Sequence, residues 1–465
     1  MNKIVTEVLV LGAGPGGYAA AFKAADKGKK VVLVDKGDIL GGVCLNRGCI
    51  PSKALLNVAH TLDETNALAD KGITVSKPEI NIDNLRKWKE GILGQLGAGI
   101  AAGAKKRDIQ IIKGKGLFKD SNSIRVETDK GQQSIEFETA ILAVGSKPTL
   151  PAAFDLGNPR IMTSTGALEL ADIPETLLVV GGGYIGMELG TVYQALGSKV
   201  TLVEALPRIL AGADKDLVRP VTKYAKSHFE DVRLSTKVEK MSTSGKKIKV
   251  VFNGKDGNIE EKYDRVLISI GRLPNTVDLG LSHTKIELDE RGFVKVNDKQ
   301  QSTDPNIYAI GDVAGGVMLA HKAAREATVA VNNICGEVDT FGGAIIPAVI
   351  FTHPEVAWCG LTEDEAKEKS IKVEVSKFSW KANGRALTMD KTDGLTKLII
   401  QPGTDRILGM GMAGQGAGDM ISEGVLAVEA GLTAMDLAQT IHPHPTLSET
   451  IMEAAEAFYG HSTHS

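Results

Sequence analysis

Only four of the 465 residues are cysteine, and neither sign of charge is in large excess. Four cysteines in a chain of this length exclude the disulfide framework of a small secreted domain. A formal net charge of −3, from 54 basic and 57 acidic residues, gives no basis for nucleic-acid binding. No apolar run reaches the roughly 18 residues that a membrane span needs. The best candidate, residues 91–104, has the length of a buried helix.

The N-terminus also lacks a targeting pattern. Met1–Leu11 contains neither a basic segment nor a cleavable apolar segment, and it runs directly into the strand-like VTEVLVLGAG. We therefore expect a cytoplasmic protein, although a mitochondrial matrix protein with its presequence removed would look the same.

Glycine, in contrast, is abundant. The 52 glycines follow no Gly-X-Y period, and most stand singly among apolar runs, which indicates tight turns where the backbone approaches something closely. The length predicts two to four domains.

Two segments repeat one pattern. Val8–Lys36 reads VLVLGAGPGGYAAAFKAADKGKKVVLVDK, and Leu177–Ala205 reads LLVVGGGYIGMELGTVYQALGSKVTLVEA. Each has an apolar run that ends in GxGxxG, a stretch with helical spacing, and a second apolar run that ends in an acid. The first copy contributes Gly12, Gly14, Gly17 and Asp35, and the second contributes Gly181, Gly183, Gly186 and Glu204.

A GxGxxG between a strand and a helix, with an acid about 20 residues further on, is the dinucleotide-binding fingerprint. The glycines allow the turn, the approach of a pyrophosphate and the packing of helix on strand, while the helix N-terminus faces the phosphates. A single copy is also compatible with a plain tight turn. Two matched copies predict two bound dinucleotides.

The acids predict which dinucleotides bind. A carboxylate at the end of the second strand favours a free ribose 2′-OH and repels a 2′-phosphate. Glu204 therefore predicts NAD rather than NADP, although the basic Arg208 lies nearby. Asp35 is compatible with the adenosine of FAD.

A cysteine pair follows the first repeat, in LGGVCLNRGCIPSK. No cluster of Cys or His follows that could complete a metal site, so we expect no metal. If the segment is helical, Lys53 shares a face with Cys49 and favours its thiolate. A low-pKa thiol beside Cys44 suits thiol–disulfide exchange, and the alternative is two unpaired structural cysteines.

GGVCLNRGCIPSK and both repeats together resemble the pyridine nucleotide–disulfide oxidoreductase family, over essentially the whole chain. The resemblance implies an α/β fold with two Rossmann-like domains, one for FAD and one for NAD, and a C-terminal α+β dimerisation domain. The expected boundaries are 1–147 for the FAD domain, 148–275 for the NAD domain, 276–345 for a central domain that completes the FAD site, and 346–465 for the dimerisation domain. Two related segments, ILAVGSKP and VLISIGRLP, would end the nucleotide domains at Gly145 and Gly271.

The resemblance also assigns the segment TDPNIYAIGD. It implies that Asp312 binds the ribityl chain of FAD, while the residues themselves are equally compatible with a strand entering a turn. The following residues would begin a helix whose positive end faces the flavin. That helix start would place Met318, Leu319 and Ala320 at the flavin.

The last motif is HPHPTLSE. A histidine can accept a thiol proton near neutral pH, and a carboxylate can orient its ring. Glu449 also fits a helix capping box that begins at Thr446, and residue chemistry cannot choose between His442 and His444. The resemblance assigns the base to His444 with Glu449 as its partner, and it implies that this loop enters the site of the other subunit of a homodimer.

The implied reaction is the oxidation of protein-bound dihydrolipoamide to lipoamide, with NAD⁺ as final acceptor. Cys44 would exchange with the substrate, Cys49 would lie against the flavin, and Lys53 would pair with Glu188. The implied partners are lipoyl domains and the core acyltransferase of 2-oxo acid dehydrogenase complexes, or the glycine cleavage system. Other readings are a scaffold that binds such a complex and a simple diaphorase acting on quinones.

Overall fold

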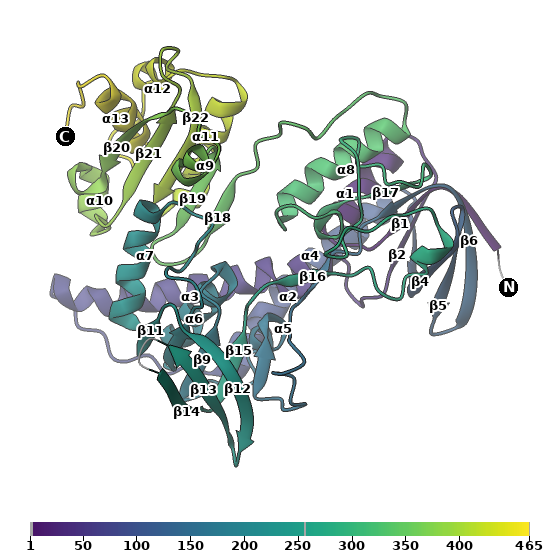
Figure 1. Cartoon of the computed structure of the whole chain (residues 1–465), viewed down its shortest axis with the longest axis horizontal. Helices are drawn as coiled ribbons and strands as arrows, with labels where there is room; N and C mark the ends of the chain where they lie inside the picture. Colours follow the sequence, from purple (N-terminus) through teal and green to yellow (C-terminus); the bar gives the residue numbers. More distant parts are fainter. Residues whose placement is uncertain (1–2, 255–256, 465) are drawn as a thin grey trace.

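The computed structural model describes residues 3–254 and 257–464, and its elements form three groups that lie side by side (Figure 1). Two groups are built on largely parallel sheets, and the third is built on an antiparallel sheet. The predicted fold class, two Rossmann-like units and a C-terminal α+β unit, is confirmed.

The first nucleotide domain carries a seven-stranded sheet in the order β3-β2-β1-β6-β5-β4, with β17 paired to the C-terminal half of β6. The helices α1 and α8 pack against each other beside this sheet. The strands are β1 (Lys3–Leu11), β2 (Val31–Asp35), β3 (Gln110–Lys113), β4 (Lys115–Asp120), β5 (Ser123–Thr128), β6 (Gly131–Leu142) and β17 (Ile307–Ala309). The helices are α1 (Pro15–Asp26), α2 (Gly42–Arg47), α3 (Cys49–Ala67), α4 (Ile82–Lys106) and α8 (Ala320–Ile334), with short 3-10 turns at Leu68–Lys71, Leu281–His283 and Gly311–Ala314.

The second nucleotide domain has a parallel five-stranded sheet in the order β11-β10-β9-β15-β8, and an antiparallel sheet of β12, β13 and β14 packs on it through apolar side chains. In the antiparallel sheet, β13 is the segment KIKVVFNG, whose apolar and polar residues alternate. The elements are β8 (Ile161–Thr163), α5 (Ser164–Glu169), β9 (Thr176–Val180), α6 (Tyr184–Ala195), β10 (Lys199–Val203), α7 (Lys215–His228), β11 (Asp231–Arg233), β12 (Lys237–Ser244), β13 (Lys247–Gly254), β14 (Gly257–Tyr263) and β15 (Arg265–Ile268).

Two short strands connect these domains, and they pair with each other. β7 (Ser146–Pro148) runs out to the second nucleotide domain, and β16 (Arg272–Pro274) returns beside it in antiparallel register. Each strand follows a glycine with positive φ, which is +67° at Gly145 and +131° at Gly271. The two similar segments ILAVGSKP and VLISIGRLP therefore form one crossing between the domains.

The end domain holds the antiparallel sheet β18-β19-β22-β21-β20. Its hydrophobic core is separate, but Ile350, Val356 and Ala413 join the core of the second nucleotide domain. The elements are β18 (Ala348–Ile350), β19 (Val356–Gly360), α9 (Glu363–Glu368), β20 (Glu374–Ser379), α10 (Gly384–Met389), β21 (Leu395–Ile400), β22 (Ile407–Ala413), α11 (Ala417–Glu429), α12 (Ala434–Gln439) and α13 (Glu449–Phe458), with a 3-10 turn at Trp380–Ala382.

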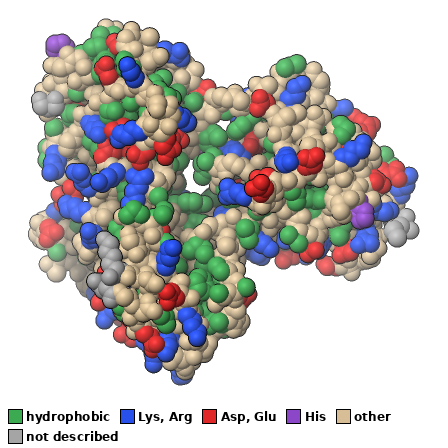
Figure 2. All heavy atoms as spheres, viewed as in Figure 1, with side chains coloured by type: hydrophobic (Ala, Val, Ile, Leu, Met, Phe, Trp, Pro, Cys, Tyr) green, Lys and Arg blue, Asp and Glu red, His purple; other side chains and the backbone are tan. Residues whose placement is uncertain are grey.

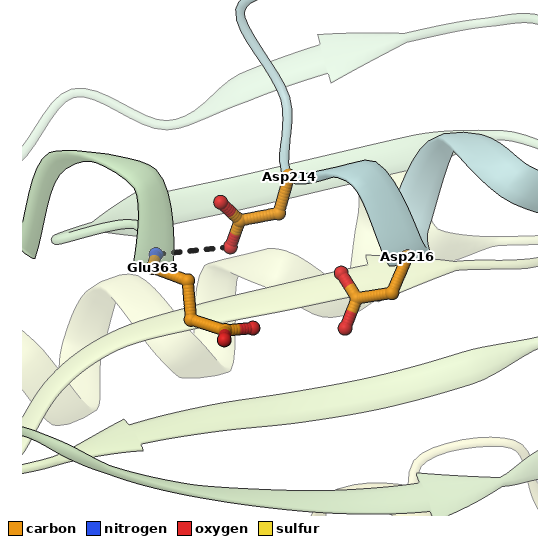
Figure 3. Close-up of side chains that lie close together, drawn as sticks. All are labelled: Asp214, Asp216 and Glu363. Atoms are coloured by element: carbon orange, nitrogen blue, oxygen red, sulfur yellow. Dashed lines mark hydrogen bonds between the residues drawn. The ribbon is translucent and has the colours of Figure 1, made fainter. Parts of the chain in front are cut away.

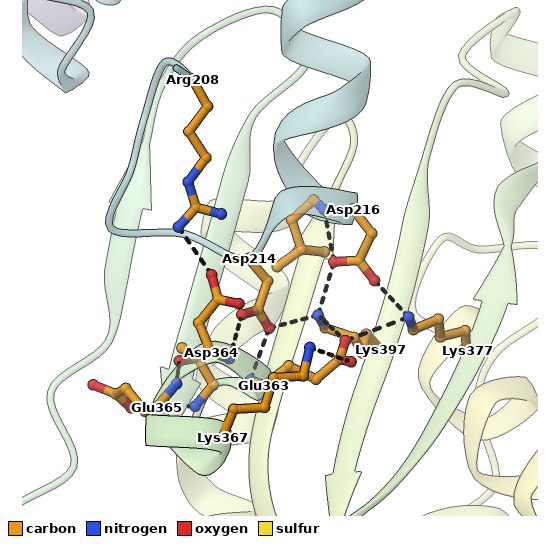
Figure 4. A network of polar contacts seen from close by, with 11 residues as sticks. Arg208, Asp214, Asp216, Glu363, Asp364, Glu365, Lys367, Lys377 and Lys397 are labelled. Atoms are coloured by element: carbon orange, nitrogen blue, oxygen red, sulfur yellow. Dashed lines mark hydrogen bonds and ion pairs between the residues drawn. The ribbon is translucent and has the colours of Figure 1, made fainter. Parts of the chain in front are cut away.

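An ion cluster around the buried Lys397 joins the end domain to the second nucleotide domain. Asp214, Asp216 and Glu363 turn their carboxylates toward one another (Figure 3). The Lys397 ammonium, 1% exposed, lies 2.5, 2.8 and 3.0 Å from oxygens of these three residues (Figure 4). Burial opposes the charge of Lys397, but its hydrogen bonds to Asp214 and Asp216 outweigh burial and raise its pKa. On the face shown in Figure 2, acidic and basic side chains gather at this junction.

Residues 91–104 do not form the buried helix that their apolar composition suggested. They belong to α4, where only Leu93, Gly97 and Ala104 of this run are buried. The physical reason is that the helix contacts α1 and α3 along one face only, and small side chains fill most of the remaining surface.

Candidate functional site

The first glycine fingerprint joins β1 to α1 by a turn that leaves no room for a Cβ at Gly12 or Gly17. Gly12 has φ +104°, and a Cβ there would lie 2.4 Å from Ala143 O. A Cβ at Gly17 would lie 1.8 Å from Gly12 O, so the start of α1 packs directly on the turn. At Gly14 a Cβ would meet no atom within 4 Å, and no side chain caps the helix. The space beside Gly14 and the uncapped start of α1 therefore suit a phosphate.

The second fingerprint repeats this geometry between β9 and α6. Gly181 has φ +105°, and its Cβ would lie 2.6 Å from Ser269 O. The Cβ of Gly186 would lie 2.0 Å from Gly181 O, while Gly183 again faces open space at an uncapped helix start. Each glycine turn and the helix start that follows it thus form a cradle that fits a pyrophosphate, and the two cradles have the same local geometry.

The acids at the ends of β2 and β10 are fixed by backbone N–H groups. Asp35 accepts hydrogen bonds from Ala13 N at 2.6 Å and Gly37 N at 2.7 Å. Glu204 accepts from Gly182 N at 2.6 Å and Leu206 N at 2.7 Å. Each carboxylate is therefore held beside the glycine turn, where a ribose would lie in a Rossmann-type site.

Arg208 does not turn toward Glu204. Its Nη2 donates to Ala211 O at 2.8 Å and to Asp364 Oδ2 of α9 at 2.9 Å (Figure 4). The positive charge that could have accepted a 2′-phosphate is thus paired with the end domain.

The two cysteines lie on two short-linked helices. Cys44 is in the last turn of α2, and Cys49 begins α3 directly after Gly48. A Cβ at Gly48 would lie 3.0 Å from Val43 O, so this link is tightly folded. Cys44 is half-buried and Cys49 is exposed.

The environment separates the two thiols in acidity. The hydrogen bond from Cys44, together with the nearby Lys53 ammonium, lowers the pKa of Cys49 to about 7. The same hydrogen bond and burial raise the pKa of Cys44. Of the two thiols, Cys49 therefore loses its proton more readily.

Lys53 and Glu188 form an ion pair between the two nucleotide domains. Lys53 Nζ of α3 lies 2.8 Å from Oε2 of Glu188, a residue of α6 that is 3% exposed. Glu188 Oε1 also accepts from Phe351 N at 3.1 Å, and the Lys53 ammonium lies 4.5 Å from the centre of the Phe351 ring. All three domains thus meet beside α3, the helix that begins at Cys49 and carries Lys53.

Asp312 lies in the 3-10 turn after β17, and its carboxylate accepts a hydrogen bond from Ser146 Oγ. Met318 and Leu319 precede α8, which begins at Ala320, within the segment where a helix start was expected. Tyr184 lies among the residues expected at the site. It is 41% exposed, and the charges near its hydroxyl are those of Arg272, Glu188, Asp312 and Cys49.

His444 and Glu449 are paired, with Nδ1 and Oε1 2.8 Å apart. The second oxygen of Glu449 accepts from Thr446 N at 2.7 Å, so one carboxylate both orients the ring and closes the turn before α13. Sequence analysis had treated helix capping and orientation of the histidine ring as alternative roles for Glu449. The helix begins at Glu449 itself, after Ser448, rather than after Thr446.

His442 has a different environment from His444. Its side chain is 4% exposed, with Nε2 2.9 Å from Glu423 Oε1 and Nδ1 2.8 Å from Thr440 O. Two acceptors hold both N–H groups of a charged ring, and the Glu423 hydrogen bond raises the pKa of His442. His444 is 71% exposed and keeps Nε2 directed away from Glu449.

One chain does not bring all of these residues together. Cys44, Cys49, Lys53 and Glu188 lie at the junction of the nucleotide domains, whereas His444 and Glu449 lie beside α13, well away from α2 (Figure 1). Sequence reasoning did not include Ser146, Arg272 or Phe351 at the site. The available signal was the polar pair Ser146 and Arg272 directly after the two crossing glycines.

Comparison with known families accounts for most of the chain. Residues 6–327 match the model described as pyridine nucleotide-disulphide oxidoreductase, and residues 346–455 match its dimerisation domain. A Vibrio parahaemolyticus protein named dihydrolipoyl dehydrogenase is 45% identical over 99% of this chain and 97% of its own length. A Staphylococcus aureus protein of that name is 43% identical over 99% and 98%.

Solved structures show the same arrangement. LpdA from Mycobacterium tuberculosis is similar with a TM-score of 0.90 at 27% identity, over 97% of this chain and 99% of that one. The flavoprotein disulfide reductase RclA from Escherichia coli, solved as a Cu(II) complex, has a TM-score of 0.87 at 27% identity, over 98% and 100%. Within residues 3–254 and 257–464, no helix is both long and apolar enough to cross a membrane.

Proposed function

The chain belongs to the pyridine nucleotide-disulphide oxidoreductase family, and we propose that it is a dihydrolipoyl dehydrogenase. It oxidises protein-bound dihydrolipoamide to lipoamide and reduces NAD⁺. The observation that carries this proposal is the Cys44–Cys49 pair, placed with Lys53 and Glu188 between two dinucleotide cradles. Relatives of this name match the chain over nearly its full length.

The first cradle fits FAD and the second fits NAD. FAD supplies the two-electron relay between a dithiol and a nicotinamide. Gly12, Gly14, Gly17 and Asp35 would hold its pyrophosphate and adenosine, with Lys53, Gly145, Asp312, Met318, Leu319 and Ala320 along the rest of the molecule. Gly181, Gly183, Gly186, Glu204 and Gly271 would hold NAD.

Thiol exchange needs a base, an accessible sulfur and a stable leaving thiolate. The His444 ring of the partner subunit takes a proton from one substrate thiol at Nε2, and Glu449 stabilises the charged ring. The substrate thiolate attacks Cys44 Sγ, the Cys44–Cys49 bond breaks, and Cys49 leaves as thiolate. The second substrate thiol then attacks the mixed disulfide, which releases lipoamide and leaves Cys44 as a thiol. The lowered pKa of Cys49 and the raised pKa of Cys44 favour this distribution of charge.

The dimerisation domain implies a homodimer, and the distance between the His444 loop and the cysteine helix in one chain supports a shared site. We propose lipoyl domains and the core acyltransferase of a 2-oxo acid dehydrogenase complex as partners, or the glycine cleavage system. The cytoplasm as the location and the four domain boundaries stay predictions from the sequence.

The test measures NADH formation from dihydrolipoamide and NAD⁺ by the purified protein, beside NADPH oxidation by glutathione disulfide. We expect turnover in the first assay only, and its loss in Cys44→Ser. Activity in the second assay alone would contradict the assigned substrate. Oxidation of NADH by a quinone that survives Cys44→Ser, without dihydrolipoamide turnover, would favour a diaphorase. Intact complex assembly with no turnover in the wild type would favour a scaffold.

A further inference from the structure

Ser146 and Arg272 lie on the paired strands β7 and β16, next to Asp312, whose carboxylate is predicted to bind FAD. Ser146 is 2% exposed, and the Arg272 side chain is 11% exposed. The proposed function gives neither side chain a role. A guanidinium so deeply buried requires a specific set of acceptors.

Arg272 donates two hydrogen bonds to Ser146. Its Nε donates to Ser146 Oγ at 2.7 Å, and its Nη2 donates to Ser146 O at 3.0 Å. Ser146 Oγ in turn contacts Asp312 Oδ2. A guanidinium has donors only, so the hydroxyl must accept from Arg272, and its single proton is left for Asp312. The direction of the chain, from Arg272 to Ser146 to Asp312, is therefore fixed by chemistry.

The backbone before Asp312 is fixed from the other side. Gly311 has φ +73°, and its N–H donates to Glu326 Oε2 of α8 at 2.7 Å. Among the described residues, the side-chain contacts of Asp312 are made through Oδ2, with Ser146 and with Arg272 Nε at 3.9 Å. Oδ1 is thereby left to accept from a ligand hydroxyl.

We propose that Ser146 and Arg272 are positioning residues that hold Asp312 in the orientation that binds the hydroxylated side chain of FAD. The inference rests on the proposed flavin site, and it adds two residues that act on that site only through Asp312. Because Arg272 reaches Oδ2 mainly through the hydroxyl, loss of Ser146 removes the orientation of the carboxylate while both charges remain.

The crossing itself does not need these side chains. Thr149 N donates to Gly271 O at 2.9 Å, Asn275 N donates to Gly145 O at 3.0 Å, and Asn275 Nδ2 donates to Val144 O at 2.9 Å. These bonds keep β7 beside β16 in Ser146 and Arg272 variants, so such variants are expected to fold.

The experiment titrates FAD into flavin-free protein and follows the quenching of flavin fluorescence. A hydrogen bond to a charged group is worth enough that Ser146→Ala should raise the dissociation constant of FAD about tenfold. Ser146→Thr, which keeps the hydroxyl, should restore binding to within about twofold of the wild type. Arg272→Met should weaken binding similarly, and Arg272→Met with Ser146→Ala should be no worse than about twofold beyond either alone.

The decisive variant pair lies in an Asp312→Ala background. There Ser146→Ala should change the FAD dissociation constant by less than about twofold, because its target is gone. Unchanged FAD affinity in the single Ser146→Ala variant, or a full tenfold loss that persists without Asp312, would overturn the proposal. Thermal unfolding of each flavin-free variant checks that the fold is retained. A wild type that binds FAD but does not oxidise dihydrolipoamide would refute the proposed function and leave this inference standing, whereas a wild type that binds no FAD refutes both.

Discussion

Replacing Lys397 with methionine should destabilise the junction between the end domain and the second nucleotide domain. The change keeps most of the side-chain volume but removes an ammonium that is 1% exposed, and it leaves Asp214, itself 4% exposed, without its cation. Removing one partner of a buried ion pair costs about 3–5 kcal/mol. Asp214 keeps the N–H groups of Glu363 and Asp364, at 3.0 and 3.2 Å, so we expect a loss near the lower value, about 3 kcal/mol.

The chain offers a matched control in Lys377. This residue contacts the same cluster, at 2.8 Å from Asp216 and 3.4 Å from Glu363, but its side chain is 42% exposed. An exposed pair contributes roughly 0–1 kcal/mol, so Lys377→Met should cost much less. Urea unfolding at fixed protein concentration compares the two variants, followed by tryptophan fluorescence, to which Trp358 and Trp380 of the end domain contribute.

The pH dependence of the stability difference between Lys397→Met and the wild type tests this account. The pKa of Lys397 is raised, so its contribution is present below the unfolded-state pKa and is lost only as the pH rises through the higher folded value. The pKa of Asp216 is lowered, despite burial, by Lys377 and Lys397, so its contribution is lost as the pH falls through that value. In Lys397→Met the unpaired carboxylates can take up protons, and the gap between variant and wild type should shrink on acidification. Equal losses for Lys377 and Lys397, or a gap that widens in acid, would refute the account.

Three further outcomes follow from the site. The rate of alkylation of the reduced protein by iodoacetamide should rise with pH, with a midpoint near pH 7 that is set by Cys49. In Lys53→Met this midpoint should move to higher pH, because the cation that favours the thiolate is lost, and an unmoved midpoint would argue against this role of Lys53. In steady-state kinetics, His444→Gln should lower dihydrolipoamide turnover by a factor of about 10²–10⁴, while His442→Gln should change it little. The reverse result would contradict the assignment of His444 as the base. Glu204→Ala should lower kcat/KM for NAD⁺ about tenfold and raise that for NADP⁺, and an unchanged ratio of the two constants would show that Glu204 does not select the nucleotide.

The parts that sequence analysis predicted are those encoded locally. Both fingerprints place their glycines, their helix start and their acid within one strand–helix–strand unit, so spacing alone indicates the contacts of Asp35 and Glu204. The pairing of Lys53 with Glu188 joins residues far apart in the chain, and only the family resemblance indicated it.

The missed contacts are long-range and have weak local signals. Lys397 lies within the apolar strand LTKLII, and nothing in that strand shows that Asp214 and Glu363 will cover it. Arg272 and Ser146 meet only because β7 and β16 pair across the domain crossing. The assignment at Glu449 failed to combine its two roles, because a carboxylate has two oxygens and the structure uses each for a different partner.

The crossing of β7 and β16 also has a consequence for the order in which the chain folds as it is synthesised. The sheet of the second nucleotide domain lies within one continuous stretch, from β8 to β15, whereas the sheet of the first waits for β17 and for α8. Domains generally fold as units while the ribosome is still extending the chain. The domain that begins second is therefore finished first, and the N-terminal β-strands remain incomplete until the polypeptide beyond the crossing has emerged to join them.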